Sequence, residues 1–412
     1  MKKISINSVL LFSLSIYFIM AVRISPSNTP YWLFGIIFFG LLGYLVLDLV
    51  NISKGFYSKL KNGLLCFLIV TVIGTSFGSE ILVRHQTAPT YNVHDILLQQ
   101  EAAIRFLVKG KNPYSENYFG TPLEKWHYSD TEVNPALYHF VMMPFYLDFA
   151  LPFYYVSNHT IGFFDGRIPL LFLFFSVLAL GFILIKDQEK RHSFLILLTF
   201  NPLTLRYMLE GRSDVFMYGF LFLGLFLLHI KRYSLAGVPI ALAFAVKQSA
   251  WPFFPFYFFY LFFKTKNLYK TFKLLVPFAA TFLLVVLPFF LWNQQAFLDS
   301  TINYLSGKTT YAYPISGYGF GRILNELGVI KSLKEYYPFQ FWQLLVGLPV
   351  LILLIRYLKS APDVGRLILV YGIFLFVYWY FSRYFHNSHL GYISMVFITA
   401  YFWPINKDLK ED

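Results

Sequence analysis

The chain has 412 residues, of which 57% are hydrophobic and only 13% are charged. A soluble globular protein of this length needs more polar residues to cover its surface, so the composition excludes that class and indicates a multi-pass membrane protein. The formal net charge is +13. Because Lys and Arg gather in short connections between apolar runs, we interpret this charge as a membrane-topology signal and expect no nucleic-acid partner.

Apolar runs that approach the length of a bilayer crossing recur along the whole chain. The sequence predicts an all-α fold with about twelve spans, given that roughly 20 apolar residues cross the hydrocarbon core. We expect one membrane domain, 1–412, with three spans in 1–82, core spans in 166–292 and further spans in 340–412. Residues 1–20 resemble a signal peptide, but Arg23 and Pro26 interrupt a cleavage pattern, which favours a retained first span.

Long segments at 83–165 and 293–339 face outward when both termini are cytoplasmic, the arrangement that best places Lys and Arg inside. Within the first, residues 133–157 are apolar but contain Pro135, Pro144 and Pro152. This segment predicts interfacial helices in a large first outer loop, and a true span is the alternative.

The 30-residue segment 234–263 has Lys247 and Gln248 at its middle and basic clusters at both ends. We expect the chain to enter the membrane, turn near Lys247 and return, because each limb is too short to cross. Pro252 and Pro255 follow the turn, where the start of a helix tolerates them. The connection 201–214 lies between similarly short limbs, and both features suggest an outward-facing cavity.

Several segments resemble a known family, in the same order along the chain. They are HDILLQQEAAIRFLVKGKNPY (94–114), FFDGRIPLLFLFFSVLALGFIL (163–184), EGRSDVFMYGFLFLGLFLL (210–228) and LAGVPIALAFAVKQSAWPFFPFYFF (235–259). This pattern is similar to C-type-fold membrane glycosyltransferases that use polyprenyl-phosphate sugars, in particular bacterial polyprenol-phosphate-mannose-dependent α-mannosyltransferases. The resemblance implies inverting transfer of a hexose, first of all mannose, to a glycolipid, glycan or protein acceptor. It places the protein in the bacterial inner membrane, among membrane lipids, with a periplasmic active site.

Such a transfer needs a carboxylate that takes the proton of the acceptor hydroxyl and cations that hold the departing phosphate. Asp95 is the candidate base, although Asp before a helical run also serves as an N-cap. His94 could tune or share this role. Glu101 is expected to pair with Arg105, four residues on, and is the reserve base.

The remaining candidates are expected to bind substrate. Lys247 lies inside an apolar segment and suits a donor phosphate, or a structural pair with Asp214. Aromatic residues around Tyr318 and Arg322 suit either a sugar or the membrane interface. The predicted substrate-binding residues are Tyr114, Arg212, Asp214, Lys247, Gln248, Arg383 and His386.

We expect no cofactor, because the phosphate leaves readily and a divalent metal is possible but not required. His386 and His389 have metal-ligand spacing but no evident third ligand, and Cys66 is the single cysteine. Alternative functions are a polysaccharide polymerase or ligase that depends on Arg383 and His386, and a non-enzymatic transporter or flippase of lipid-linked sugars.

Overall fold

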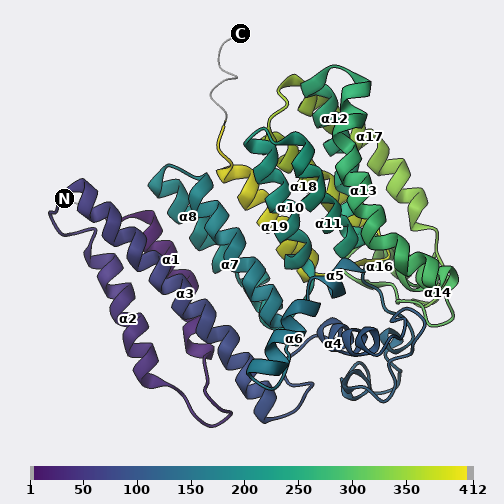
Figure 1. Ribbon diagram of the computed structural model, residues 1–412, viewed down its shortest axis with the longest axis horizontal. Coiled ribbons are helices and arrows are strands. Elements are labelled where there is room, and N and C mark those ends of the chain that lie inside the picture. The colour runs from purple at the N-terminus through teal and green to yellow at the C-terminus, as the bar shows by residue number, and fades with distance from the viewer. Residues whose placement is uncertain (1–3, 406–412) are drawn as a thin grey trace.

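The computed structural model describes residues 4–405, and within them the fold is all-α, as the sequence predicts. The single strand pair of the described residues is short and parallel, with β1 (Ser316–Gly317) beside β2 (Tyr384–Phe385). Lys2, Lys3, Lys407 and Lys410, which contribute to the expected positive inner face, lie outside the described residues. Figure 1 shows long helices standing side by side, with α4, α5 and α6 gathered at the lower end.

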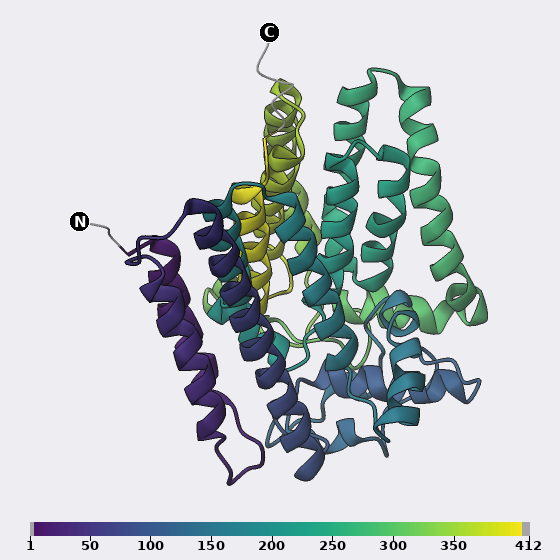
Figure 2. The same cartoon turned by 60° about the vertical axis from the view of Figure 1, so that its left-hand side comes forward.

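The N-terminal helices form a layer at one side of the molecule, coloured purple in Figures 1 and 2. This layer consists of α1 (Ile6–Ala21), α2 (Tyr31–Val46) and α3 (Lys54–Gln86), and α8 (Gln188–Thr199) packs against it. A buried ion pair joins its elements, since the Lys61 ammonium lies 2.7 Å from the Asp48 carboxylate. Ser8 donates a hydrogen bond of 2.6 Å to the same carboxylate.

The first long loop folds into short helices, in place of one continuous span. They are α4 (Asp95–Val108), the 3₁₀ turns η1 (Pro122–Lys125) and η2 (Pro135–Leu137), α5 (Phe145–Asp148) and α6 (Leu151–Thr160). Each proline of 133–157 stands at or next to the start of one of these elements, because proline lacks the N–H that the interior of a helix requires.

The middle of the chain builds the core beside α4. Its helices are α7 (Arg167–Leu184), α8, α9 (Pro202–Leu209), α10 (Asp214–His229), α11 (Tyr233–Val246), η3 (Gln248–Phe253), α12 (Phe254–Thr265) and α13 (Leu268–Trp292). The predicted break at Lys247 is confirmed: α11 ends there after 14 residues, and α12 has 12 residues. Lys247 itself is extended, with φ −154° and ψ 135°.

The second long loop and the C-terminal helices complete the fold. The loop contains α14 (Gln294–Leu298), the π-helix η4 (Asp299–Asn303), α15 (Tyr304–Ser306), β1 and α16 (Phe320–Glu326). It is followed by α17 (Phe339–Ser360), α18 (Val364–Tyr380), β2 and α19 (Asn387–Phe402).

The prediction of about twelve spans is wrong. Within the described residues, four helices are long and apolar enough to cross a membrane: α3, α7, α13 and α17. A fifth results if α9 and α10, which are bent by 117°, count as one broken span. Other apolar runs form the shorter helices α1, α2, α11 and α18, of 10–17 residues, which end before they reach bilayer length.

Candidate functional site

Asp95 stands at the start of α4, which is held against the turn between α9 and α10. The backbone N–H of His94 donates to the carbonyl of Glu210 at 2.8 Å. Gly211 has a φ of +82°, and a Cβ at this position would lie 2.1 Å from Leu97 Cδ1 of α4. Only glycine suits both this backbone conformation and this approach, so the turn fixes the place of Asp95.

The Asp95 carboxylate has short polar contacts, and its side chain is 17% exposed. His94 Nδ1 lies 2.7 Å from Asp95 Oδ1, and the Asn134 amide donates to Oδ2 at 3.4 Å. The same nitrogen accepts the backbone N–H of Ile96 at 3.3 Å, which caps the start of α4. Burial alone would raise the pKa of Asp95, yet His94, Asn134 and Arg212 together hold it below its ordinary value.

Asp214 and Lys247 meet where the bent pair α9–α10 approaches the break after α11. The Lys247 ammonium lies 2.6 Å from Asp214 Oδ1, with the side chains 21% and 14% exposed. The structural pair that the sequence left open is therefore formed. It satisfies both charges in a place where either alone would be costly.

Arg212 lies in the turn between α9 and α10, next to Glu210. Its Nε is 3.1 Å from Glu210 Oε2, and its guanidinium stands 4.3 Å from the centre of the Tyr207 ring. It acts electrostatically on both Asp95 and Asp214. At 24% exposure, its side chain keeps contact with the surroundings of the site.

His386 joins this group from the segment before α19. Its Nε2 lies 3.1 Å from Ser316 Oγ, and it is electrostatically close to Arg212 and His94. Burial, reinforced by these neighbours, lowers the pKa of His386 to about 4, so the ring is neutral at pH 7. Segments far apart in the sequence thus converge in what we call the ionisable cluster: His94, Asp95, Arg212, Asp214, Lys247 and His386.

Within residues 4–405, no group of three or more His, Cys, Asp or Glu side chains is arranged to hold a metal ion. His389, next to His386, instead accepts the backbone N–H of His386 at 3.0 Å through Nδ1. The acids of the ionisable cluster are interleaved with Arg and Lys, a pattern that suits an anionic ligand better than a cation.

Arg383 does not present its guanidinium to this cluster. It is 3% exposed, and it donates to the carbonyl groups of Tyr313, Leu333, Lys334 and Glu335. Burial lowers the pKa of Arg383 to about 10, which still leaves it charged at pH 7. Its donors hold the second long loop, which gives it a structural role, and its side chain also lines a polar cavity, so the predicted substrate contact stays a prediction.

Tyr114 is also structural by its position. The side chain is 3% exposed, and its hydroxyl donates to the Met142 carbonyl at 2.9 Å. Its ring packs against Phe140, Phe289 and Phe297. These contacts enclose the side chain among aromatic residues, and the predicted substrate contact of Tyr114 stays a prediction.

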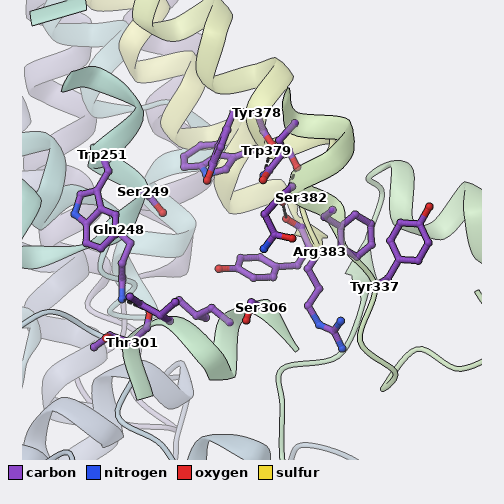
Figure 3. A pocket seen from close by; sticks show the side chains of 16 residues that line it. Gln248, Ser249, Trp251, Thr301, Ser306, Tyr337, Tyr378, Trp379, Ser382 and Arg383 are labelled. Carbon is purple, nitrogen blue, oxygen red and sulfur yellow. Dashed lines mark hydrogen bonds between the residues drawn. The ribbon is translucent and has the colours of Figure 1, made fainter. Parts of the chain in front are cut away.

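Gln248 follows Lys247 and ties both long loops to the break after α11. Its amide nitrogen donates to the carbonyls of Val141 and Thr301 at 3.0 and 2.9 Å. Both N–H groups of the Gln248 amide are therefore used. The side chain borders a cavity of about 220 Å³, shown in Figure 3. Polar and aromatic side chains line this cavity, among them Ser249, Trp251, Ser306, Tyr378, Ser382 and Tyr384.

Trp251 also borders a second, apolar cavity of about 360 Å³ that is lined by Phe244, Phe254, Phe278 and Phe282. Tyr384, a wall residue of the polar cavity, interacts electrostatically with Asp214 of the ionisable cluster. The polar cavity shares Trp251 with an apolar hollow among α11, α12 and α13.

A buried ion network lies beside α4 and was not predicted from the sequence. Glu101 is 4% exposed and pairs with Arg84 at 2.8 Å, so its expected pairing with Arg105 is wrong. Arg84 also reaches Asp165 at 2.7 Å, and Asp165 pairs with the fully buried Arg167 at 2.7 Å. The run FFDGR, with opposite charges two residues apart inside apolar sequence, was the available signal.

No protein-family model matches the chain, and no curated protein or solved structure is significantly similar to it.

Proposed function

We propose that the protein is a membrane glycosyltransferase that moves a hexose from a polyprenyl phosphate to an acceptor hydroxyl, with mannose as the first candidate sugar. The observation that carries this proposal is the position of Asp95, an ionised carboxylate held by His94 and Asn134 beside the cation Arg212. The reaction requires this combination of a proton acceptor and a positive charge.

The transfer step is a direct displacement with inversion. The acceptor oxygen forms a bond to the anomeric carbon while the bond from that carbon to the phosphate oxygen breaks. The proton of the acceptor hydroxyl passes to Asp95, and the electron pair of the broken bond leaves with the phosphate. Arg212 stabilises the charge that grows on the phosphate, because a guanidinium matches phosphate oxygens in a planar, bidentate manner.

Lys247 contributes positive charge to the same region through its pair with Asp214. Both cations already pair with a carboxylate, Lys247 with Asp214 at 2.6 Å and Arg212 with Glu210 at 3.1 Å. We give Arg212 the leading role at the phosphate because a guanidinium has further N–H donors beyond the one that faces Glu210. Lys247 then positions Asp214 and the break between α11 and η3, and it adds a weaker attraction for the donor.

The two cavities suit the parts of a lipid-linked sugar. Amide, hydroxyl and aromatic groups line the polar cavity of Figure 3, as hydroxyl-rich ligands require. The apolar cavity at Trp251 suits the first isoprene units of the donor. A helical membrane protein that takes this donor would receive it from the bilayer, and we propose the bacterial inner membrane with the ionisable cluster on the periplasmic side.

The enclosed position of Arg383 weighs against the polymerase or ligase alternative. That alternative relied on Arg383 and His386 for a diphosphate-linked chain, and all the Arg383 contacts described above are to backbone carbonyl groups. A non-enzymatic transporter would bind the same lipid-linked sugar without releasing polyprenyl phosphate, so the assay below separates the two.

The decisive experiment uses the full chain in lipid nanodiscs with radiolabelled polyprenyl-phosphate mannose and native membrane glycolipids as acceptors. Asp95→Asn keeps the size of the side chain but removes the proton acceptor, and we expect transfer to fall by about 10²- to 10⁴-fold. Donor binding and the melting temperature should stay near wild type.

Asp130→Asn is the matched control, because Asp130 lies in the same loop and its side chain is 94% exposed. It should transfer sugar at the wild-type rate. Full activity of Asp95→Asn would contradict the assignment of the base. If the wild-type protein binds the donor but never releases polyprenyl phosphate, it is not a transferase and the transporter alternative gains.

A further inference from the structure

A larger cavity borders β1 and has no part in the proposed transfer step. It measures about 500 Å³ and lies between the two long loops. Its lining includes Glu132, Ser316, Tyr318, Arg322, Lys334 and His386. Glu132 comes from the first loop, and the others come from the second loop and the segment before α19.

Backbone pairing and one exposed ion pair form the walls of this cavity. The Lys334 ammonium lies 2.9 Å from the Glu132 carboxylate and joins the two loops. β1 pairs with β2, and Gly317, at φ +81°, approaches Phe385 so closely that a Cβ would lie 1.9 Å from its carbonyl oxygen. Backbone contacts of this kind hold the loop in place without help from a ligand.

Two side chains of the cavity lack the partners that such groups normally have. Within residues 4–405, the Arg322 guanidinium has no hydrogen-bond or ion-pair partner, although its residue is only partly exposed. The Tyr318 side chain is 69% exposed, and no aromatic ring packs on it. An unpartnered guanidinium recognises an anionic group, and an open aromatic ring offers a flat apolar surface.

One end of the cavity reaches the ionisable cluster. His386 lines the cavity and is electrostatically close to Arg212 and His94. Its Nε2 contacts Ser316 Oγ at 3.1 Å, and both residues line the cavity. A molecule bound here would therefore contact a residue of the ionisable cluster, His386.

We propose that this cavity binds the acceptor, and that the acceptor is an acidic saccharide whose anionic group pairs with Arg322 while a sugar ring rests on Tyr318. The role of acceptor rests on the proposed function, because it assumes a transfer reaction. The binding of an acidic saccharide does not depend on any transfer step. Arg322 is the unpaired cation of the cavity, since the charge of Lys334 is taken by Glu132. The cavity volume admits a short oligosaccharide.

The test is direct binding, measured by titration calorimetry on the full chain in a non-ionic detergent. Trigalacturonate is the acidic probe, and maltotriose is the neutral probe of similar length. We expect trigalacturonate to bind more tightly. Arg322→Gln should weaken it by about tenfold or more, as loss of a charged hydrogen-bond pair does, and should leave maltotriose unchanged.

Two further variants sharpen the outcome. Tyr318→Ala should weaken both probes, because the ring serves any sugar. Lys331→Gln is the matched control: Lys331 is an exposed cation of the same loop that does not line the cavity, and its loss should change neither probe.

The inference is overturned if trigalacturonate shows no saturable binding, if maltotriose binds as tightly, or if Arg322→Gln leaves the Kd of trigalacturonate unchanged. Asp95→Asn should bind trigalacturonate like wild type. If that binding holds while the transfer assay fails for every lipid-linked hexose, the proposed function falls and the acidic-saccharide site stands. If transfer occurs but trigalacturonate does not bind, the proposed function stands and the acidic-saccharide site falls.

Discussion

Arg84 holds Glu101 through both carboxylate oxygens, with nitrogen–oxygen distances of 2.8 and 2.9 Å. The two residues come from the end of α3 and the middle of α4, and both are buried. This pair therefore fixes the helix that begins with Asp95. Arg167 extends the connection by donating to the Leu209 carbonyl at 3.1 Å, in the helix before Arg212.

Glu101→Gln should destabilise the protein by about 3–5 kcal/mol, because it leaves the buried Arg84 charge with one carboxylate fewer. The measurement is thermal unfolding of the full chain in detergent, and the variant should melt well below wild type. Glu116→Gln is the control, since the Glu116 pair with Lys111 is 3.2 Å long and partly exposed. It should cost less than about 1 kcal/mol. Equal melting temperatures for the two variants would show that the network does not hold α4.

The pair of Asp214 and Lys247 can be tested by a double-mutant cycle. Lys247→Met alone leaves a carboxylate without its partner and should cost about 3 kcal/mol, whereas Lys247→Met with Asp214→Asn should recover most of that loss. Stability is measured by unfolding, and the KM for the donor is measured in parallel. If Lys247 also attracts the donor phosphate, the double variant regains stability but keeps a raised KM. A wild-type KM in the double variant would assign Lys247 a purely structural role.

The pH dependence of transfer should report on His94. The Asp95 pKa lies below its ordinary value of 3.8, and its ionised form is the proposed base, so activity should persist until the pH falls below that ordinary value. In His94→Gln the burial of Asp95 remains while a cause of the lowered pKa disappears. The acidic limb of the rate profile should then move to higher pH.

The comparison for this profile is His127→Gln, since His127 makes an exposed 3.8 Å contact with Asp130 in the same loop. Its acidic limb should coincide with that of wild type. An unshifted limb in His94→Gln would mean that Asp95 is not the group whose protonation stops the reaction.

The sequence predicted those features whose signal lies within one short segment. Lys247 inside an apolar run, followed by Pro252 and Pro255, marked the break between α11 and α12, because a lone cation and proline are both costly inside a membrane helix. The all-α class followed from the same apolar runs. The number of apolar runs did not predict the number of membrane spans, because hydropathy does not show where a helix ends.

Side-chain contacts between distant segments could not be predicted in the same way. Spacing of four residues suggested that Glu101 binds Arg105, but Arg84, 17 positions earlier, occupies it. Arg383 was expected to face a phosphate because its type suits one. Nothing near it in sequence indicates that the carbonyl groups of Tyr313 and Glu335 surround it. Such contacts depend on how loops fold over one another.

The structural role of Arg383 can be tested by a conservative substitution. Arg383→Lys keeps the charge but cannot reproduce the planar fork that reaches several carbonyl groups at once. The second long loop should loosen locally, since each buried carbonyl that loses its donor costs about 1–3 kcal/mol. Limited trypsin digestion should therefore cut at Lys331 or Lys334 faster than in wild type, while Arg356→Lys, on an exposed face of α17, should digest normally. Saccharide binding in the large cavity should weaken together with the faster cleavage, because Tyr318 and Arg322 stand on the same loop. An unchanged digestion pattern with lost donor binding would instead restore Arg383 as a phosphate ligand.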